Sequence, residues 1–206
     1  TAVCGGKTVT VPRTDAYEVD IAGVQSAIDE RTKVIFIASP NNPSGNATSR
    51  GDLLKLVETG VVVVVDEADY ECCGKTVATL VPRYSNLIVL GSFSKWAGLG
   101  GLRAGYGIFS VNIAELIRRI KIPYNVNAAA MVAVKESLAD KDYLQGKVKA
   151  IIAERERLFE KLKKQGVLVP LPSQANFILC RVAKGNARKI KQGLDSKGIF
   201  IRYFDT

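Results

Sequence analysis

Three short apolar runs constrain the fold of this chain more than any other feature of its sequence. They span residues 34–37, 61–65 and 87–90, are rich in valine and isoleucine, and are bounded by polar residues or glycine. Continuous apolarity of this kind is typical of strands buried on both faces, as in a parallel sheet. Helix-length segments at 23–29 and 49–59 alternate with the runs. This order predicts an α/β fold with a mostly parallel sheet.

The C-terminal part of the chain has a different pattern. Apolar residues recur near helical spacing between Val148 and Leu162, and Gly166 is the expected helix end. The segments after it predict, in order, strands at 167–171 and 176–182, a basic helix at 186–197 and a strand at 199–203. We therefore expect two domains, a larger one at residues 1–143 and part of a smaller α+β domain at residues 144–206.

Composition excludes several classes of protein. The chain has 206 residues, of which 47% are hydrophobic and 24% charged, which is typical of a globular protein. It contains no histidine, and its four cysteines form no Cys-x-x-Cys pair, so a zinc site and a histidine-dependent nucleophile are not expected. This cysteine usage favours a reducing compartment. No apolar run is long enough to cross a membrane.

The net charge and the first residues of the chain each support one further expectation. The net charge of +9 comes from scattered basic residues, which predicts a basic exterior rather than a nucleic-acid or membrane surface. Residues 1–12 contain no initiator methionine and are expected to approach a strand, so we expect the chain to begin inside a domain.

Polar and turn residues directly follow each apolar run. Residues 39–45 follow the first run, Asp66 and Glu67 the second, and residues 91–95 the third. Carboxyl ends of parallel strands bind ligands in open α/β sheets, so these side chains should converge on one crevice. Arg103 follows a glycine-rich stretch and, with serine hydroxyls, suits a phosphate. A lysine beside a phosphate and a carboxylate suits covalent chemistry with pyridoxal phosphate.

Six motifs together resemble the fold-type I pyridoxal-phosphate aminotransferases, and within them the histidinol-phosphate aminotransferase group. Each motif is weak alone, but their order and spacing are specific, and the resemblance covers almost the whole chain. It implies much of a three-layer cofactor-binding large domain and part of a small domain, and hence an interior piece of a longer enzyme. The motifs lie at 39–45, 65–68, 92–95, 98–103, 123–126 and 175–177.

The resemblance implies roles for individual residues around the cofactor. Lys95 would bond to the cofactor and shuttle protons, and Asp66 would pair with its pyridine nitrogen. Asn42 would hydrogen-bond the cofactor 3-oxygen beside the substrate. The other implied roles are phosphate binding by Ser92, Ser94 and Arg103, and contact with the substrate's anionic groups by Arg202. Asp66 and Asn42 are also common residues in turns and helix caps, and that alternative stays open.

One position departs from the family pattern. The family usually has a tyrosine three residues after the aspartate, where it donates to the cofactor 3-oxygen, whereas this chain has Asp69 followed by Tyr70. A carboxylate would repel that oxygen. Either Tyr70 takes the place of the tyrosine or the site is altered.

The resemblance implies amino transfer between L-histidinol phosphate and 2-oxoglutarate in histidine biosynthesis. It also implies a homodimer with small-molecule partners, in the cytoplasm or in a plastid, and no metal. Aromatic amino-acid aminotransferases and threonine-phosphate decarboxylase-like enzymes share much of this core and remain alternatives. A non-catalytic regulatory or scaffold domain is a third. The chain taken by itself is expected to be inactive.

Two other motif matches lack the accompanying residues that their protein families require. Residues 66–69 spell the Asp-Glu-Ala-Asp of RNA helicases, but neither Gly-Lys-Thr triplet has the upstream glycine that a phosphate-binding P-loop needs. Residues 92–95 match the Ser-x-x-Lys of penicillin-binding enzymes, but no Ser-Asp-Asn follows. We therefore do not expect either activity.

Overall fold

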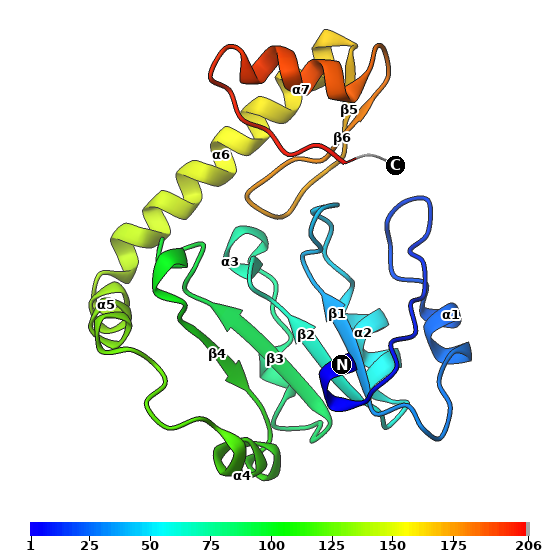
Figure 1. Ribbon diagram of the computed structural model, residues 1–206, viewed down its shortest axis with the longest axis vertical. Coiled ribbons are helices and arrows are strands. Elements are labelled where there is room, and N and C mark those ends of the chain that lie inside the picture. The colour runs from blue at the N-terminus through cyan, green and yellow to red at the C-terminus, as the bar shows by residue number, and fades with distance from the viewer. Residues whose placement is uncertain (205–206) are drawn as a thin grey trace.

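The computed structural model describes residues 1–204, with a four-stranded sheet in the N-terminal part (Figure 1). The strands lie in the order β1 (Val34–Ala38), β2 (Val62–Asp66), β3 (Leu87–Ser92) and β4 (Gly105–Ile108). β1, β2 and β3 are parallel, and β4 runs antiparallel to β3. The predicted α/β fold with a mostly parallel sheet is therefore confirmed.

Short helices connect the strands and begin at capping side chains. α1 (Ile21–Ser26) begins after Asp20, whose Oδ1 accepts from the Gly23 N–H at 2.9 Å. α2 (Arg50–Val57) begins after Ser49, whose hydroxyl accepts from the Asp52 N–H at 3.0 Å. These bonds satisfy backbone donors that a helix start leaves unpaired. α3 (Tyr70–Cys73) is a single turn after β2.

The main core lies between α2, the turns before β3 and one face of the sheet. Alternate residues of the strands point into it, because side chains of a strand alternate between faces. Burying such apolar side chains is the main stabilising contribution to a fold of this kind. The core contains Ile35, Ile37, Val63, Val65, Leu87 and Val89 from the strands, Leu53, Leu56 and Val57 from α2, and Val77, Leu80 and Val81 from the turns.

The opposite face of β1 is open, which corrects the expectation that every apolar run is buried on both faces. Phe36 is 69% exposed, whereas Val64, its partner on β2, is 6% exposed. β2 is an interior strand, whereas β1 is an edge strand of the sheet among residues 1–204. Apolar sequence therefore predicts the strand, but the position in the sheet decides how much of it is covered.

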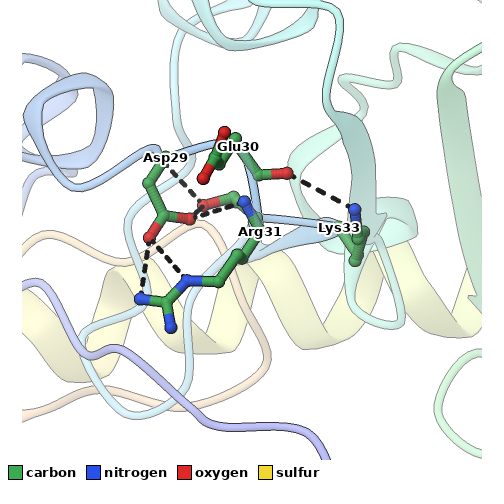
Figure 2. Close-up of polar contacts among 5 residues, drawn as sticks. Asp29, Glu30, Arg31 and Lys33 are labelled. Atoms are coloured by element: carbon green, nitrogen blue, oxygen red, sulfur yellow. Dashed lines mark hydrogen bonds and ion pairs between the residues drawn. The ribbon is translucent and has the colours of Figure 1, made fainter.

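A polar turn leads from α1 into β1 at the edge of the sheet opposite the strands' carboxyl ends. Asp29 Oδ1 accepts from the Arg31 N–H at 2.9 Å and from the Thr32 hydroxyl at 3.0 Å. Its Oδ2 pairs with the Arg31 guanidinium at 3.2 Å, as Figure 2 shows. Lys33 Nζ donates to the Glu30 carbonyl at 3.4 Å. The hydrogen bonds from Thr32 and Arg31 lower the pKa of Asp29.

The chain then leaves the sheet and builds a second unit. α4 (Val111–Ile120) and α5 (Ala128–Ala139) precede α6 (Lys141–Gln165), a long helix that carries the chain from the sheet to the C-terminal part (Figure 1). There β5 (Leu168–Pro170) pairs antiparallel with β6 (Cys180–Val182), and α7 (Ala187–Asp195) follows. α6 stops at Gly166, which has φ 69°, as expected. The proposed domain division at 143/144 falls in the first turn of α6 and stays a prediction.

Three segments differ from expectation. No strand is assigned within 199–204, and 176–182 contains only the short strand β6, because the C-terminal sheet has just two strands in the described residues. Residues 1–12 begin with a 3₁₀ turn, Ala2–Cys4, closed by hydrogen bonds to the Thr1 carbonyl.

No helix within residues 1–204 is long and apolar enough to cross a membrane. The described cysteines are all free.

Candidate active site

The polar segments after β1, β2 and β3 meet at one edge of the sheet. The Ser39 N–H donates to the Asp66 carbonyl at 2.9 Å, and the Glu67 N–H donates to the Leu90 carbonyl at 2.8 Å. These bonds extend the parallel register one residue beyond the strands, because Ala38 pairs with Asp66 and Asp66 with Leu90. The convergence expected from the sequence is confirmed for the backbone of these segments.

Lys95 and two carboxylates form an electrostatic group at this edge. Asp66, at the end of β2, has an exposed side chain whose Oδ1 accepts from the Ala68 N–H at 3.0 Å. Asp69 is only 6% exposed. Burial raises the pKa of the Asp69 carboxyl, the Lys95 ammonium acts to lower it, and Asp66 adds to the rise. Asp69 therefore interacts electrostatically with both Lys95 and Asp66.

Asp69 and Tyr70 have different surroundings. Tyr70 and Tyr106 interact, and both line a small cavity of about 80 Å³ with Glu67 and Gly91. Burial raises the pKa of Tyr106 to about 12. Asp69 has an electrostatic link to Lys95, and whether Tyr70 contacts the cofactor stays a prediction.

Glu67 anchors the loop after β2, a role that the sequence did not reveal. It is 3% exposed, and its carboxylate accepts from the Val77 N–H at 2.7 Å and from the Thr76 hydroxyl at 2.5 Å. A buried carboxylate is tolerated only when hydrogen bonds compensate for its lost hydration. The only signal in the sequence was its place next to Asp66, so its partners came from the fold.

Ser92 ends β3, and Ser94 and Arg103 lie on the loop that follows it. The Ser94 N–H donates to the Ser92 hydroxyl at 3.0 Å, and the Phe93 N–H donates to the Ala104 carbonyl at 3.2 Å. Arg103 has φ 57°, and its Nη1 donates to the Gly100 carbonyl at 2.9 Å. Since Ser92 also pairs with Gly105, the two ends of the loop lie together. Two hydroxyls and an exposed guanidinium are suited to bind a phosphate.

Asn42 lies on a loop that the C-terminal unit contacts. Its side chain is exposed at the turn of residues 39–47. The Gln174 N–H donates to the Gly45 carbonyl at 2.6 Å, and the Gln174 side chain accepts from the Ala47 N–H at 3.0 Å. A Cβ at Gly45 would meet Ser173 Oγ at 2.3 Å. No sequence pattern predicts a role for Ser173 or Gln174, because their contact depends on how the two units pack.

Arg202 stands apart from this group. It is exposed within a segment of irregular backbone after α7, and no hydrogen bond or ion pair joins it to Asn42, Asp66 or Lys95 in the described part of the chain. Nor do residues 1–204 contain a cluster of acidic, cysteine and histidine side chains that could hold a metal ion.

The chain is similar to known aminotransferases over nearly its whole length. The family model "Aminotransferase class I and II" matches residues 1–204. A histidinol-phosphate aminotransferase of Dehalococcoides mccartyi is 49% identical over 200 residues, which are 97% of this chain and 56% of that protein. The chloroplastic histidinol-phosphate aminotransferase 1 of Arabidopsis thaliana is 43% identical over 208 residues, 100% of this chain and 50% of that protein.

A solved structure agrees with these relatives. The histidinol-phosphate aminotransferase of Sinorhizobium meliloti, solved in complex with pyridoxal-5′-phosphate, superimposes with a TM-score of 0.86 at 30% sequence identity. The match covers 96% of this chain and 56% of that one. The chain spans about half the length of the curated relatives it matches. On the family match over residues 1–204, the chain belongs to the class I and II aminotransferases.

Proposed function

We propose that the protein to which this chain belongs is a pyridoxal-phosphate-dependent aminotransferase that moves an amino group between L-histidinol phosphate and 2-oxoglutarate. The observation that carries the proposal is the group of Lys95, Asp66 and Asp69 at the carboxyl ends of the strands, next to the loop of Ser92 and Arg103. The names of relatives at 43–49% identity support the choice of substrate.

The residues present suit this cofactor. The Asp69 carboxyl has one buried oxygen, Oδ1, without a hydrogen-bond partner among the described residues. This oxygen can therefore accept a hydrogen bond from a ligand. Lys95, Asp66 and Arg103 are exposed on the same edge. The amine suits the cofactor's aldehyde, the carboxylate its ring nitrogen, and the loop its phosphate. We infer that Ser92, Ser94 and Arg103 hold its phosphate and that Asp66 binds its ring nitrogen.

Each residue then has a distinct task. When bound, pyridoxal phosphate supplies an aldehyde that bonds to amines and a ring that withdraws electrons. Lys95 provides the amine and moves a proton at Nζ, and the Asp66 carboxylate keeps the ring nitrogen protonated. Asn42 orients the ring's 3-oxygen and faces the substrate, with Tyr70 a further cofactor contact in the proposal. Arg202 binds the anionic group of the substrate.

The remaining proposals concern the whole protein. It acts as a homodimer on a small-molecule amino donor and a 2-oxo acid, without contact to nucleic acid or membrane, and in the cytoplasm or a plastid. The large cofactor domain ends near residue 143, and the small domain begins at residue 144. The aromatic aminotransferase alternative differs from this proposal in the amino donor. The threonine-phosphate decarboxylase alternative differs in the reaction, because a decarboxylase releases CO2 and transfers no amino group.

The test uses the full-length protein. Incubation with pyridoxal phosphate, borohydride reduction and peptide mass analysis should label Lys95, and Lys95→Ala should lose the label and more than about 10³-fold in kcat, because the reacting amine is gone. Glutamate formation from 2-oxoglutarate should be faster with histidinol phosphate than with phenylalanine or threonine phosphate. Labelling of another lysine alone would overturn the cofactor site, and a preference for another donor would overturn the substrate.

A further inference from the structure

Gln174 of the C-terminal unit is hydrogen-bonded to the loop of residues 39–47 at two points. Its backbone N–H donates to the Gly45 carbonyl at 2.6 Å, and its side-chain Oε1 accepts from the Ala47 N–H at 3.0 Å. The second bond joins residues 127 positions apart in the chain. A backbone contact and a side-chain contact on nearby loop residues together restrain both the position and the orientation of the loop.

Asn42 lies within a turn of this loop that two backbone hydrogen bonds close. The Asn41 N–H donates to the Asn46 carbonyl at 2.9 Å, and the Gly45 N–H donates to the Asn41 carbonyl at 2.7 Å. The Asn42 side chain is exposed and has no hydrogen-bond partner within residues 1–204. Its position therefore depends on the turn, and Gln174 attaches the turn to the C-terminal unit.

Gln174 belongs to a segment that is anchored to α6. Its neighbour Ala175 is fully buried, and the Ala175 carbonyl accepts from Arg155 Nη1 of α6 at 2.8 Å. The Ala175 N–H donates to the Ser173 hydroxyl at 3.1 Å, so the residues on both sides of Gln174 are held. The Arg155 side chain is itself only 10% exposed. Gln174 therefore links the long helix α6 to the turn that carries Asn42.

We propose that Gln174 is a positioning residue for Asn42: its two hydrogen bonds set where the Asn42 side-chain amide meets the 3-oxygen of the cofactor. The inference rests on the proposed function, which assigns Asn42 to that oxygen. A hydrogen bond donated to an oxygen favours its charged, deprotonated form, and the bond weakens steeply when its geometry is distorted. A turn released from Gln174 should therefore leave Asn42 a poorer donor, and the bound cofactor should keep its proton to higher pH.

The first measurement is amide hydrogen exchange in the full-length, cofactor-free protein. Gln174→Ala removes the acceptor of the Ala47 N–H and should speed exchange at Ala47 at least about tenfold, as expected for the loss of one hydrogen bond. Gln174→Glu keeps an oxygen acceptor and should restore slow exchange. The matched control is Gln192→Ala on α7, an exposed glutamine of the same unit, which should leave Ala47 unchanged. If Gln174→Ala does not fold, Gln174→Ser, whose side chain is too short to reach Ala47, replaces it. Native exchange at Ala47 without the Gln174 side chain would overturn the inference.

The second measurement is the pH midpoint of the absorption change of pyridoxal phosphate bound to the full-length protein. Gln174→Ala should raise this midpoint by about 0.3–1 pH unit, and Asn42→Ala should raise it further because the donor itself is gone. Gln174→Ala should add nothing to Asn42→Ala, because Gln174 acts through Asn42. A merely structural Gln174 would leave the midpoint unchanged. An equal rise with and without Asn42 would also overturn the inference.

Separate observations would contradict the two proposals. If borohydride traps pyridoxal phosphate on Lys95 and Gln174→Ala keeps the native midpoint, the inference alone is overturned. Failure to trap the cofactor on Lys95 of the native protein would overturn the proposed function, on which the inference rests.

Discussion

Glu71 is a partly buried carboxyl group with two other acidic side chains nearby. It lies on α3 with a buried oxygen, Oε2, that has no hydrogen-bond partner among the described residues. Burial raises the pKa of its carboxyl to about 7, and the neighbouring Asp69 and Glu67 add to the rise. Because the folded state holds this proton more tightly than the unfolded state, its stabilising effect is complete below pH 4.5 and is lost as the pH rises through about 7.

We therefore expect Glu71→Gln to stabilise the protein at alkaline pH. At pH 8 the native carboxylate is charged and poorly hydrated, and its replacement should raise Tm by about 2–4 °C, a value that allows for its partial exposure. At pH 4.5 the change should be close to zero. Thermal unfolding at both pH values measures the difference, with the exposed Glu58→Gln as control. An equal shift at both pH values would contradict a role for Glu71 ionisation.

Asn86 is the residue that joins two elements of the sheet. Its side-chain amide donates to the Val57 carbonyl at 2.8 Å and to the Val61 carbonyl at 2.9 Å. Its backbone carbonyl accepts from the Val63 N–H at 2.8 Å. One residue before β3 therefore closes the loop between α2 and β2 and sets the register in which β3 begins. That register pairs Asp66 with Leu90, two residues before Ser92.

We expect Asn86→Ala to destabilise the fold by about 1–3 kcal/mol, because two backbone carbonyls lose their donors. Urea unfolding measures the change. Asn112, which is exposed near the start of α4, provides the control, and Asn112→Ala should change stability by less than about 0.5 kcal/mol. Equal effects of the two substitutions would show that the Asn86 side-chain hydrogen bonds do not contribute to the stability of the fold.

At the scale of the whole molecule, two connections unite the sheet with the C-terminal unit. α6 joins them along the chain, and the loop of residues 39–47 joins them through space (Figure 1). Gly45 adopts φ +78° and approaches Ser173 so closely that a Cβ would lie 2.3 Å from its hydroxyl oxygen. The loop that carries Asn42 is thus held by residues more than a hundred positions later in the chain.

Two glycine substitutions distinguish the loss of stability caused by the Gly45–Ser173 contact from the loss caused by backbone strain. Gly45→Ala and Gly60→Ala both place a side chain at a left-handed φ, +78° and +81°, but a Cβ at Gly60 would meet nothing within 4 Å. Both should lose about 1–2 kcal/mol from strain, and Gly45→Ala a further 1–3 kcal/mol, roughly, from overpacking. Only Gly45→Ala should speed proteolysis of the 171–176 loop. Equal stability losses and equal proteolysis would contradict docking through Gly45.

Local patterns in the sequence were enough to predict the α/β class, the three parallel strands and the polar segments that follow them. Apolar periodicity and turn residues are local signals, and the motif order around Asp66, Lys95 and Arg103 was specific enough to predict the family. The same local signals wrongly predicted a strand at 199–203, which has no neighbouring strand in the described C-terminal sheet.

The burial of Asp69 and the covered face of β1 follow from tertiary packing. Packing leaves Asp69 Oδ1 without a hydrogen-bond partner among the described residues and places Tyr70 with Tyr106 around a small cavity. The open side of Phe36 and the contact of Gly45 with Ser173 likewise depend on neighbours distant in the chain. Burial and pairing are properties of surroundings, and those surroundings form only when separate segments pack together.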